Sequence, residues 1–190
     1  SVCGTVNDRC VAGGTPEYLS LSFILEEGFS FRDLRAITAS IAEEAKKCGV
    51  IIATGDTKVV ESGKGDGIYI NTAGIGFRKA ALPGREAIRP GDAVLVSGSL
   101  GCHGAAVMMA RSGLLLENSP LVSDCQPLHR ISAAALDAAG GGSIRILRDP
   151  TRGGAATTLN EFTEGMPFSI ELDEASLPIE PAVAAACDML

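Results

Sequence analysis

Residues 149–154 (DPTRGG) combine residue types that can hold a phosphate group or a metal ion. They follow an apolar run at residues 144–147, which we interpret as a strand, and precede a helix-like segment at residues 155–164. Paired glycines let backbone N–H groups approach a ligand closely, and a helix N-terminus favours anions. Asp149 could hold a hard cation such as Mg²⁺, which prefers carboxylate and phosphate oxygens. Taken alone, an ordinary strand–turn–helix with Asp149 as a turn or cap residue explains this segment better.

A second glycine–carboxylate element, TGDTK at residues 54–58, follows an apolar segment that we interpret as a buried strand. Asp56 comes after a glycine at the end of that strand, Thr57 offers a hydroxyl group, and Lys58 carries a point charge suited to phosphate. A third acid, Asp8, lies in the small-residue segment CGTVND. Three acids in Gly/Thr-rich surroundings fit a Mg-nucleotide site. Their spacing alone does not establish that they converge.

A third candidate element is the glycine-rich loop at residues 98–104. It follows AVLV at residues 93–96, which we predict to be a central strand, and precedes a short helix predicted at residues 105–112. Such a loop could border a phosphate or an adenine ribose, and a plain tight turn is the alternative. His103 within it fits a structural role or a ligand role, whereas His129 is interpreted as structural.

The chain carries six motifs, in the order VCGTVND, LSFILEEGF, TGDTKVV, GKGDGIYINTAGIG, RPGDAVLVSG and RDPTRGG. In this order they resemble the HypE family of hydrogenase maturation factors. That family belongs to the ATP-binding group of aminoimidazole ribonucleotide synthetase, selenophosphate synthetase and thiamine-monophosphate kinase. The resemblance extends over nearly all 190 residues, and TGDTKVV together with DPTRGG is specific. It implies an α/β (α+β) PurM-like fold with an N-terminal ATP-binding lobe at residues 1–90 and a C-terminal lobe at residues 91–190.

Both ends of the chain interrupt patterned sequence, since it begins at Ser1 and its helix-like segment at residues 181–190 reaches no stop signal. We therefore expect a chain truncated at both ends, without the opening strands of the first lobe and the closing elements of the second. The resemblance places the acceptor Cys of the family reaction beyond Leu190. Residues 1–190 alone would then be inactive, and no catalytic residue is assigned within them.

The resemblance implies an ATP-dependent carbamoyl dehydratase, a lyase that converts a carboxamide on its C-terminal Cys into a thiocyanate for the cyanide ligands of [NiFe]-hydrogenase. Its cofactors would be ATP and Mg²⁺, bound between the lobes. Its partners would be a HypF-type carbamoyltransferase, the HypC–HypD complex and, through the first lobe, a second copy in a homodimer. Carried over to this sequence, the metal ligands would be Asp56 and Asp149. The nucleotide-binding residues would be Asp8, Asp56, Thr57, Lys58, Gly98, Gly101, His103, Gly104 and Arg152.

One residue departs from the family pattern, because Cys102 stands where an acidic or basic residue is more usual. Two other functions stay open. The first is another ATP-using enzyme of the same superfamily, of the selenophosphate synthetase or thiamine-monophosphate kinase type. The second is a docking module for hydrogenase assembly that has no catalytic activity.

A helix is predicted from about residue 31 to residue 48. Ser30 is a suitable N-cap, Asp33 makes a weak variant of the capping box, and Gly49 provides a C-terminal stop. One apolar face repeats along it at Leu34, Ile37, Ile41, Ala45 and Cys48. We further predict a strand at residues 50–54, an alternating strand from residue 68, and a Pro/Gly-rich linker at residues 82–91.

Composition supports a soluble α/β protein, with 46% hydrophobic and 21% charged residues and 23 glycines. A formal net charge of −7 argues against binding to nucleic acid or to an anionic membrane. The sequence contains no apolar run near the roughly 20 residues of a membrane span and no visible signal peptide. The six cysteines form no C-x-x-C pair, which argues against a zinc or thioredoxin-like site and favours a reducing, cytoplasmic setting without disulfides.

Overall fold

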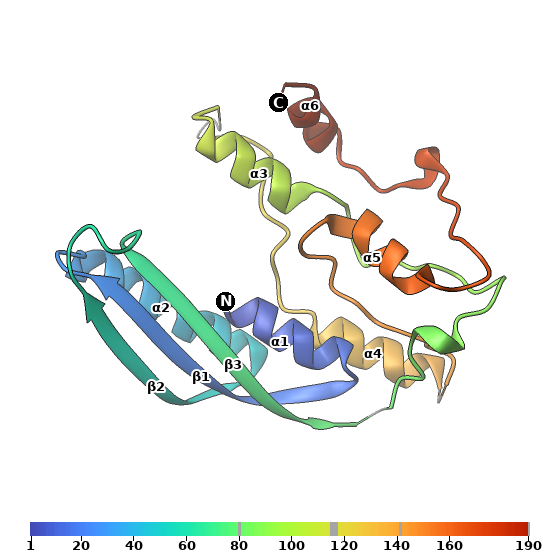
Figure 1. Ribbon diagram of the computed structural model, residues 1–190, viewed down its shortest axis with the longest axis horizontal. Coiled ribbons are helices and arrows are strands. Elements are labelled where there is room, and N and C mark those ends of the chain that lie inside the picture. The colour runs from blue at the N-terminus through green and yellow to red at the C-terminus, as the bar shows by residue number, and fades with distance from the viewer. Residues whose placement is uncertain (80, 115–117, 141, 190) are drawn as a thin grey trace. The chain divides into compact units, whose positions relative to one another are not determined.

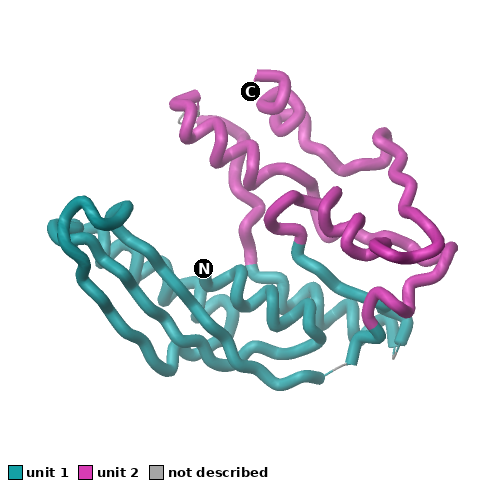
Figure 2. Tube along the Cα trace, in the orientation of Figure 1, with its two compact units in different colours: residues 1–83, 127–149 teal, residues 84–126, 150–190 magenta. Residues whose placement is uncertain are grey.

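The computed structural model describes residues 1–79, 81–114, 118–140 and 142–189, so that Leu190 lies outside the described part. The chain divides into two compact units, coloured separately in Figure 2. Unit 1 comprises residues 1–83 and 127–149, and unit 2 comprises residues 84–126 and 150–190. The predicted lobes differ from these units in residues 84–90, which belong to unit 2, and in residues 127–149, which return to unit 1. The two-lobe division at residue 90 therefore stays a prediction.

Unit 1 contains a three-stranded sheet in the order β2-β1-β3 (Figure 1). Its strands are β1 (Gly14–Glu26), β2 (Ile51–Val60) and β3 (Ile68–Arg78). Strand β1 pairs in parallel with β2 and antiparallel with β3. Helix α2 (Phe31–Cys48) connects the parallel pair, because parallel neighbours need a crossover connection.

One face of this sheet is covered by the helices of unit 1. Helices α1 (Val2–Val11) and α2 pack there against Leu19 of the central strand, and α4 (His129–Ala139) packs against α1. Helix α1 was not predicted, although Val2, Val6 and Cys10 recur every four residues and are all buried. Asp8 therefore lies on a helix and not in an irregular segment.

Helix α1 approaches β3 closely because position 74 has no side chain. A Cβ atom at Gly74 would lie 2.8 Å from Cγ2 of Thr5 and 3.1 Å from Cδ2 of Leu19. The hydroxyl groups of Thr5 and Thr72 form a hydrogen bond of 2.6 Å at the same contact. These contacts fix the helix, and with it Asp8, against the sheet.

The predicted helix at residues 31–48 is confirmed by α2. The Ser30 hydroxyl accepts a hydrogen bond from the Asp33 N–H, and Gly49 ends the helix in the left-handed conformation at φ 70°. The predicted buried strand at residues 50–54 is corrected. Strand β2 runs from residue 51 to residue 60 and is mostly exposed, because it lies at the edge of the sheet.

Unit 2 is built from helices, with a core between α3 (Cys102–Arg111) and α6 (Pro181–Met189). Its other elements are α5 (Gly154–Thr163) and two short 3₁₀ helices, η1 (Arg85–Ala87) and η2 (Glu174–Ser176). Among the described residues, no helix has the length and apolar character needed to cross a membrane.

Two predicted strands, at residues 93–96 and 144–147, are not strands in the structure. The side chain of Leu95 is 91% exposed, so the first segment is far from the predicted central position. A strand requires a hydrogen-bonded neighbour. Neither segment has one within the described part of the chain.

Candidate metal and nucleotide site

Asp149 and Asp8 are the two predicted site residues that unit 1 brings together. Asp149 is buried, with only 9% of its surface exposed, whereas Asp8 is exposed on α1. Burial raises the pKa of Asp149, and the charge of Asp8 raises it further. Its own backbone and Arg148 oppose this rise. The buried carboxylate therefore lies within electrostatic range of a second carboxylate, an arrangement that a cation would relieve.

Asp56, Thr57 and Lys58 lie on β2. The register pairs Asp56 with Ser22 and Thr57 with Phe23, and Phe23 packs on the helical core. Successive residues of a strand alternate between faces, so Asp56 belongs to the face of the sheet away from the helices. Its carboxylate accepts a hydrogen bond of 2.8 Å from the backbone N–H of Thr57.

The edge of the sheet at β2 is hollowed by an open groove of about 620 Å³. Asp56 and Thr57 line this groove together with Leu21, Phe23 and residues 52–55. Gly55 is required beside it, because a Cβ atom there would lie 2.5 Å from the carbonyl oxygen of Leu21. The absence of a side chain at position 55 thus lets β2 pair closely with β1 beside the groove.

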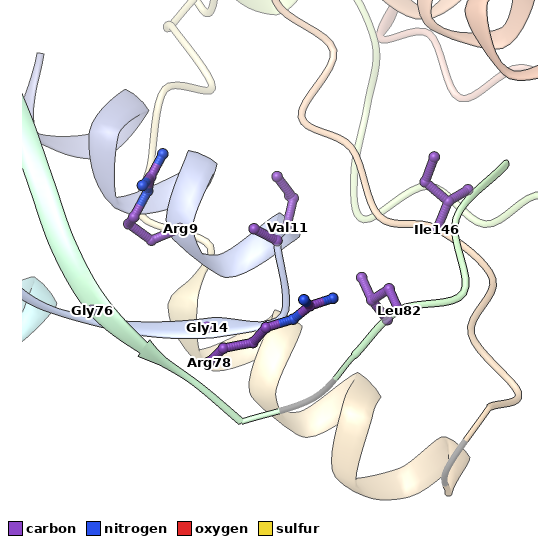
Figure 3. Close-up of a pocket in the computed structure, with 8 residues that line it drawn as sticks. Arg9, Val11, Gly14, Gly76, Arg78, Leu82 and Ile146 are labelled. Carbon is purple, nitrogen blue, oxygen red and sulfur yellow. The ribbon is translucent and has the colours of Figure 1, made fainter.

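A second pocket of unit 1, of about 420 Å³, lies where α1, β1 and β3 meet residues 82 and 146 (Figure 3). Its lining residues are Arg9, Val11, Ala12, Gly14, Gly76, Arg78, Leu82 and Ile146. None of the predicted site residues lines it. The guanidinium groups of Arg9 and Arg78 lie apart in Figure 3 and do not converge on a common point.

The described residues contain no group of three or more His, Cys, Asp or Glu side chains that could hold a metal ion. Asp8 and Asp149 nevertheless suit Mg²⁺, which is commonly held by one or two carboxylates together with waters and substrate phosphates. The common metal site of Asp56 and Asp149 stays a prediction. Within the described part of the chain, the charged side chains that shift the pKa of Asp149 are those of Asp8 and Arg148, and Asp56 is not among them.

In unit 2, the predicted nucleotide loop is held by the segment that precedes α6. The Ser99 hydroxyl donates a hydrogen bond of 2.6 Å to Glu180, and the Leu100 N–H donates one of 2.8 Å to the carbonyl of Pro178. Gly98 is exposed, and Gly101 has a positive φ of 83° as the N-cap of α3. The loop is therefore shorter than predicted, because α3 begins at residue 102.

His103 and Gly104 lie in the first turn of α3 and are exposed. The Nδ1 atom of His103 is 2.9 Å from the hydroxyl oxygen of Ser123, which also accepts a hydrogen bond from the Cys125 N–H. This pairing supports the structural interpretation of His103. A nucleotide contact by His103 or Gly104 stays a prediction.

The two glycines of DPTRGG are required by the backbone at the start of α5. Gly153 and Gly154 have φ values of 73° and 62°, and a Cβ atom at Gly153 would lie 2.1 Å from the hydroxyl oxygen of Thr157. Arg152, just before them, is exposed. The motif is therefore a tight turn into a helix, as expected, and Arg152 is accessible to a ligand.

One residue of this region was missed by the sequence analysis. Asn7 is buried, and its side-chain oxygen accepts a hydrogen bond of 2.8 Å from the backbone N–H of Leu128. No local pattern could have indicated this contact, because the two residues are 121 positions apart in the chain.

Comparison with known proteins identifies the family to which the chain belongs. The N-terminal domain of the AIR synthase related protein family matches residues 1–77, and its C-terminal domain matches residues 89–190. Carbamoyl dehydratase HypE of Rhizobium leguminosarum bv. viciae is 51% identical to the chain over 191 residues, covering 100% of this chain and 54% of that protein. The chain spans about half the length of the curated relatives it matches.

Two crystal structures are similar to the whole chain. The HypE–HypF complex gives 44% identity and a TM-score of 0.91, covering 99% of this chain and 61% of that one. HypE in complex with ATP gives 42% identity and a TM-score of 0.92, covering 99% and 56%. The predicted resemblance to HypE and the predicted α/β PurM-like fold are confirmed by these similarities. With both of its domains matched, the chain belongs to the AIR synthase related protein family.

Proposed function

We propose that this chain is the Mg-ATP-binding part of an ATP-dependent carbamoyl dehydratase that acts in hydrogenase maturation. The similarity to HypE over the whole chain supports the activity. Among the features of the structure, the buried carboxylate of Asp149 beside Asp8 carries the proposal. A buried acid without an ion-pair partner among the described residues is costly unless a ligand compensates it.

The roles proposed for the other residues follow from their chemistry. Asp8 and Asp149 would hold Mg²⁺. Asp56, whose side chain belongs to the other face of the sheet, is carried over as a metal ligand from the resemblance to HypE alone. Bound Mg²⁺ would neutralise the charge that develops during phosphoryl transfer. Lys58 and Arg152 are exposed cations suited to phosphate oxygens, and the Thr57 hydroxyl is a suitable hydrogen-bond donor. Gly98, Gly101, His103 and Gly104 would border the nucleotide.

The proposed reaction removes water from a carboxamide carried by a cysteine thiol. An amide oxygen is a poor leaving group as water, but it leaves readily once it has received the γ-phosphoryl group. One amide proton is lost when the oxygen is phosphorylated and the second when the C–O bond breaks, and the products are a thiocyanate, ADP and phosphate. The task of the residues above is to position and neutralise the phosphates, since phosphoryl transfer depends mainly on positioning and electrostatics.

The proposed partners are a HypF-type carbamoyltransferase, the HypC–HypD complex and a second copy of the chain. The homodimer is supported by the sheet face away from the helices. We call it the outer face, and its large exposed apolar side chains are Tyr18, Ile24, Ile51, Tyr69, Ile75 and Phe77. The register places Ile51, Tyr18 and Ile75 side by side across the three strands. This row is separated from Ile24 and Tyr69 by the polar row of Asp56, Ser22 and Asn71, and its exposed apolar side chains fit an interaction surface.

The proposed activity is tested with the full chain carrying a carbamoylated acceptor cysteine. Mass spectrometry of the intact protein should show the loss of one water when ATP and Mg²⁺ are added together, and no loss when either is omitted. Replacement of ATP by a non-hydrolysable analogue should also prevent the loss. Dehydration without ATP, or ATP hydrolysis without any mass change, would contradict the proposal.

A further inference from the structure

The side chain of Asn7 joins two parts of unit 1 that are distant in the sequence. It is 8% exposed and follows Val6, which is completely buried. A buried amide needs hydrogen-bond partners, and its Oδ1 atom accepts a bond of 2.8 Å from the Leu128 N–H. Leu128 is the N-cap residue of α4, so this bond fixes where α4 begins along α1.

Helix α4 opens the segment that returns to unit 1 at residues 127–149, and Asp149 is the last residue of that segment. In Figure 1, α4 lies beside α1, in agreement with the packing of the two helices. Asp8 follows Asn7 directly and acts electrostatically on Asp149. On α1, Asn7 therefore accepts a hydrogen bond from the beginning of residues 127–149. The next residue, Asp8, acts electrostatically on the last residue of that segment, Asp149.

We propose that Asn7 is a positioning residue of the metal site, whose hydrogen bond to Leu128 anchors residues 127–149 on α1 and thereby keeps Asp149 beside Asp8. The inference rests on the proposed metal role of Asp149. Helix α1 is a suitable base, because its contacts with Gly74 and Thr72 fix it on the sheet. The amide suits this task, because it offers an acceptor oxygen without adding a third negative charge beside the two carboxylates.

The test measures metal affinity directly and needs no turnover. Binding of Mn²⁺, as a substitute for Mg²⁺, is followed by electron paramagnetic resonance in the full chain with a non-hydrolysable ATP analogue. Asn7→Ala should weaken Mn²⁺ binding by about 10- to 100-fold, the usual loss when a residue that orients a metal ligand is removed. Ile41→Val trims a buried side chain of the same core on α2 and should leave Mn²⁺ affinity unchanged.

The wild-type protein provides a second measurement that does not depend on the folding of a variant. Coupling between two sites is reciprocal. Binding of Mn²⁺ and nucleotide should therefore slow hydrogen exchange of the Leu128 amide. Unchanged exchange at Leu128 on metal binding would overturn the inference.

A third variant separates failure of the inference from failure of the proposed function. Asp149→Asn should abolish Mn²⁺ binding. If it does so while Asn7→Ala binds Mn²⁺ as tightly as the wild type, Asn7 has only a structural role and the inference is wrong. If Asp149→Asn binds Mn²⁺ normally, or the wild type binds none, the proposed metal site is wrong and the inference falls with it.

Discussion

Self-association through the outer face should depend on Ile75 of β3. This side chain is 70% exposed, and it neighbours Tyr18 in the register. Complete burial of an isoleucine side chain is worth about 1.5–3 kcal/mol, so covering the exposed part in a dimer would contribute about 1–2 kcal/mol. A twofold interface contains the residue twice, which gives about 2–4 kcal/mol.

Ile75→Ser should therefore weaken the dimer by roughly 30- to 1000-fold, since each 1.4 kcal/mol is a factor of ten. The free energy of unfolding of the protomer should change by about 1 kcal/mol or less, because strand preferences span that range and the side chain is not buried. Sedimentation over a range of protein concentrations measures the dissociation constant.

Phe31→Ser provides the matched control, because Phe31 is 80% exposed but lies at the start of α2 and not on the sheet. Its dimer should match the wild type. A wild-type protein that stays monomeric at high concentration, or an Ile75→Ser dimer as tight as the wild type, would refute the assignment of the outer face.

Three further predictions concern the core and the buried acids. Leu19→Ala should lower the free energy of unfolding by about 2–5 kcal/mol in urea denaturation, because Leu19 is 2% exposed in the core of unit 1; a loss below 1 kcal/mol would contradict this packing. Burial raises the pKa of Cys10 from 9.0 to about 11, so its thiolate is roughly 100-fold scarcer at pH 8. Iodoacetamide should therefore modify the exposed Cys125 well before Cys10, and equal rates in mass spectrometry would refute this. Burial and Asp8 raise the pKa of Asp149 above its ordinary 3.8, so the ionised carboxylate destabilises the folded state at neutral pH. In metal-free buffer, Asp149→Asn should therefore raise the free energy of unfolding at neutral pH. This gain should shrink as the pH falls through the folded pKa and vanish below 3.8, whereas a gain independent of pH would show another cause.

The sequence predicts best those elements whose determinants are local. Helix α2 was predicted with both ends correct, because Ser30 and Gly49 act within one turn of the residues they cap. Helix α1 was missed, because its glycine, threonine and asparagine residues prefer turns. Its formation depends on burial of Val6 against the sheet, which is a tertiary effect.

The strand predictions at residues 93–96 and 144–147 were wrong, because strand formation depends on pairing with a neighbouring strand. Residues 93–96 have a strong strand pattern, but a strand also needs a neighbour, and the pattern contains no information about one. The site shows the same limit. The types of Asp8, Asp56 and Asp149 predicted a Mg-nucleotide site. The electrostatic effect of Asp8 on Asp149 and the bond from Leu128 to Asn7 depend instead on the return of residues 127–149 to unit 1.

Calorimetric titration of Mg-ATP into the wild type and Asp149→Asn measures whether the buried carboxylate of Asp149 holds Mg²⁺ for ATP. The wild type should bind ATP only with Mg²⁺ present, and saturation at 100 times the dissociation constant should stabilise its fold by about 2.7 kcal/mol. The Asn variant should remain folded in a melting experiment and show no Mg²⁺-dependent binding. Equal affinity of the two proteins for Mg-ATP would exclude Asp149 as a Mg²⁺ ligand and leave DPTRGG as an ordinary turn into α5.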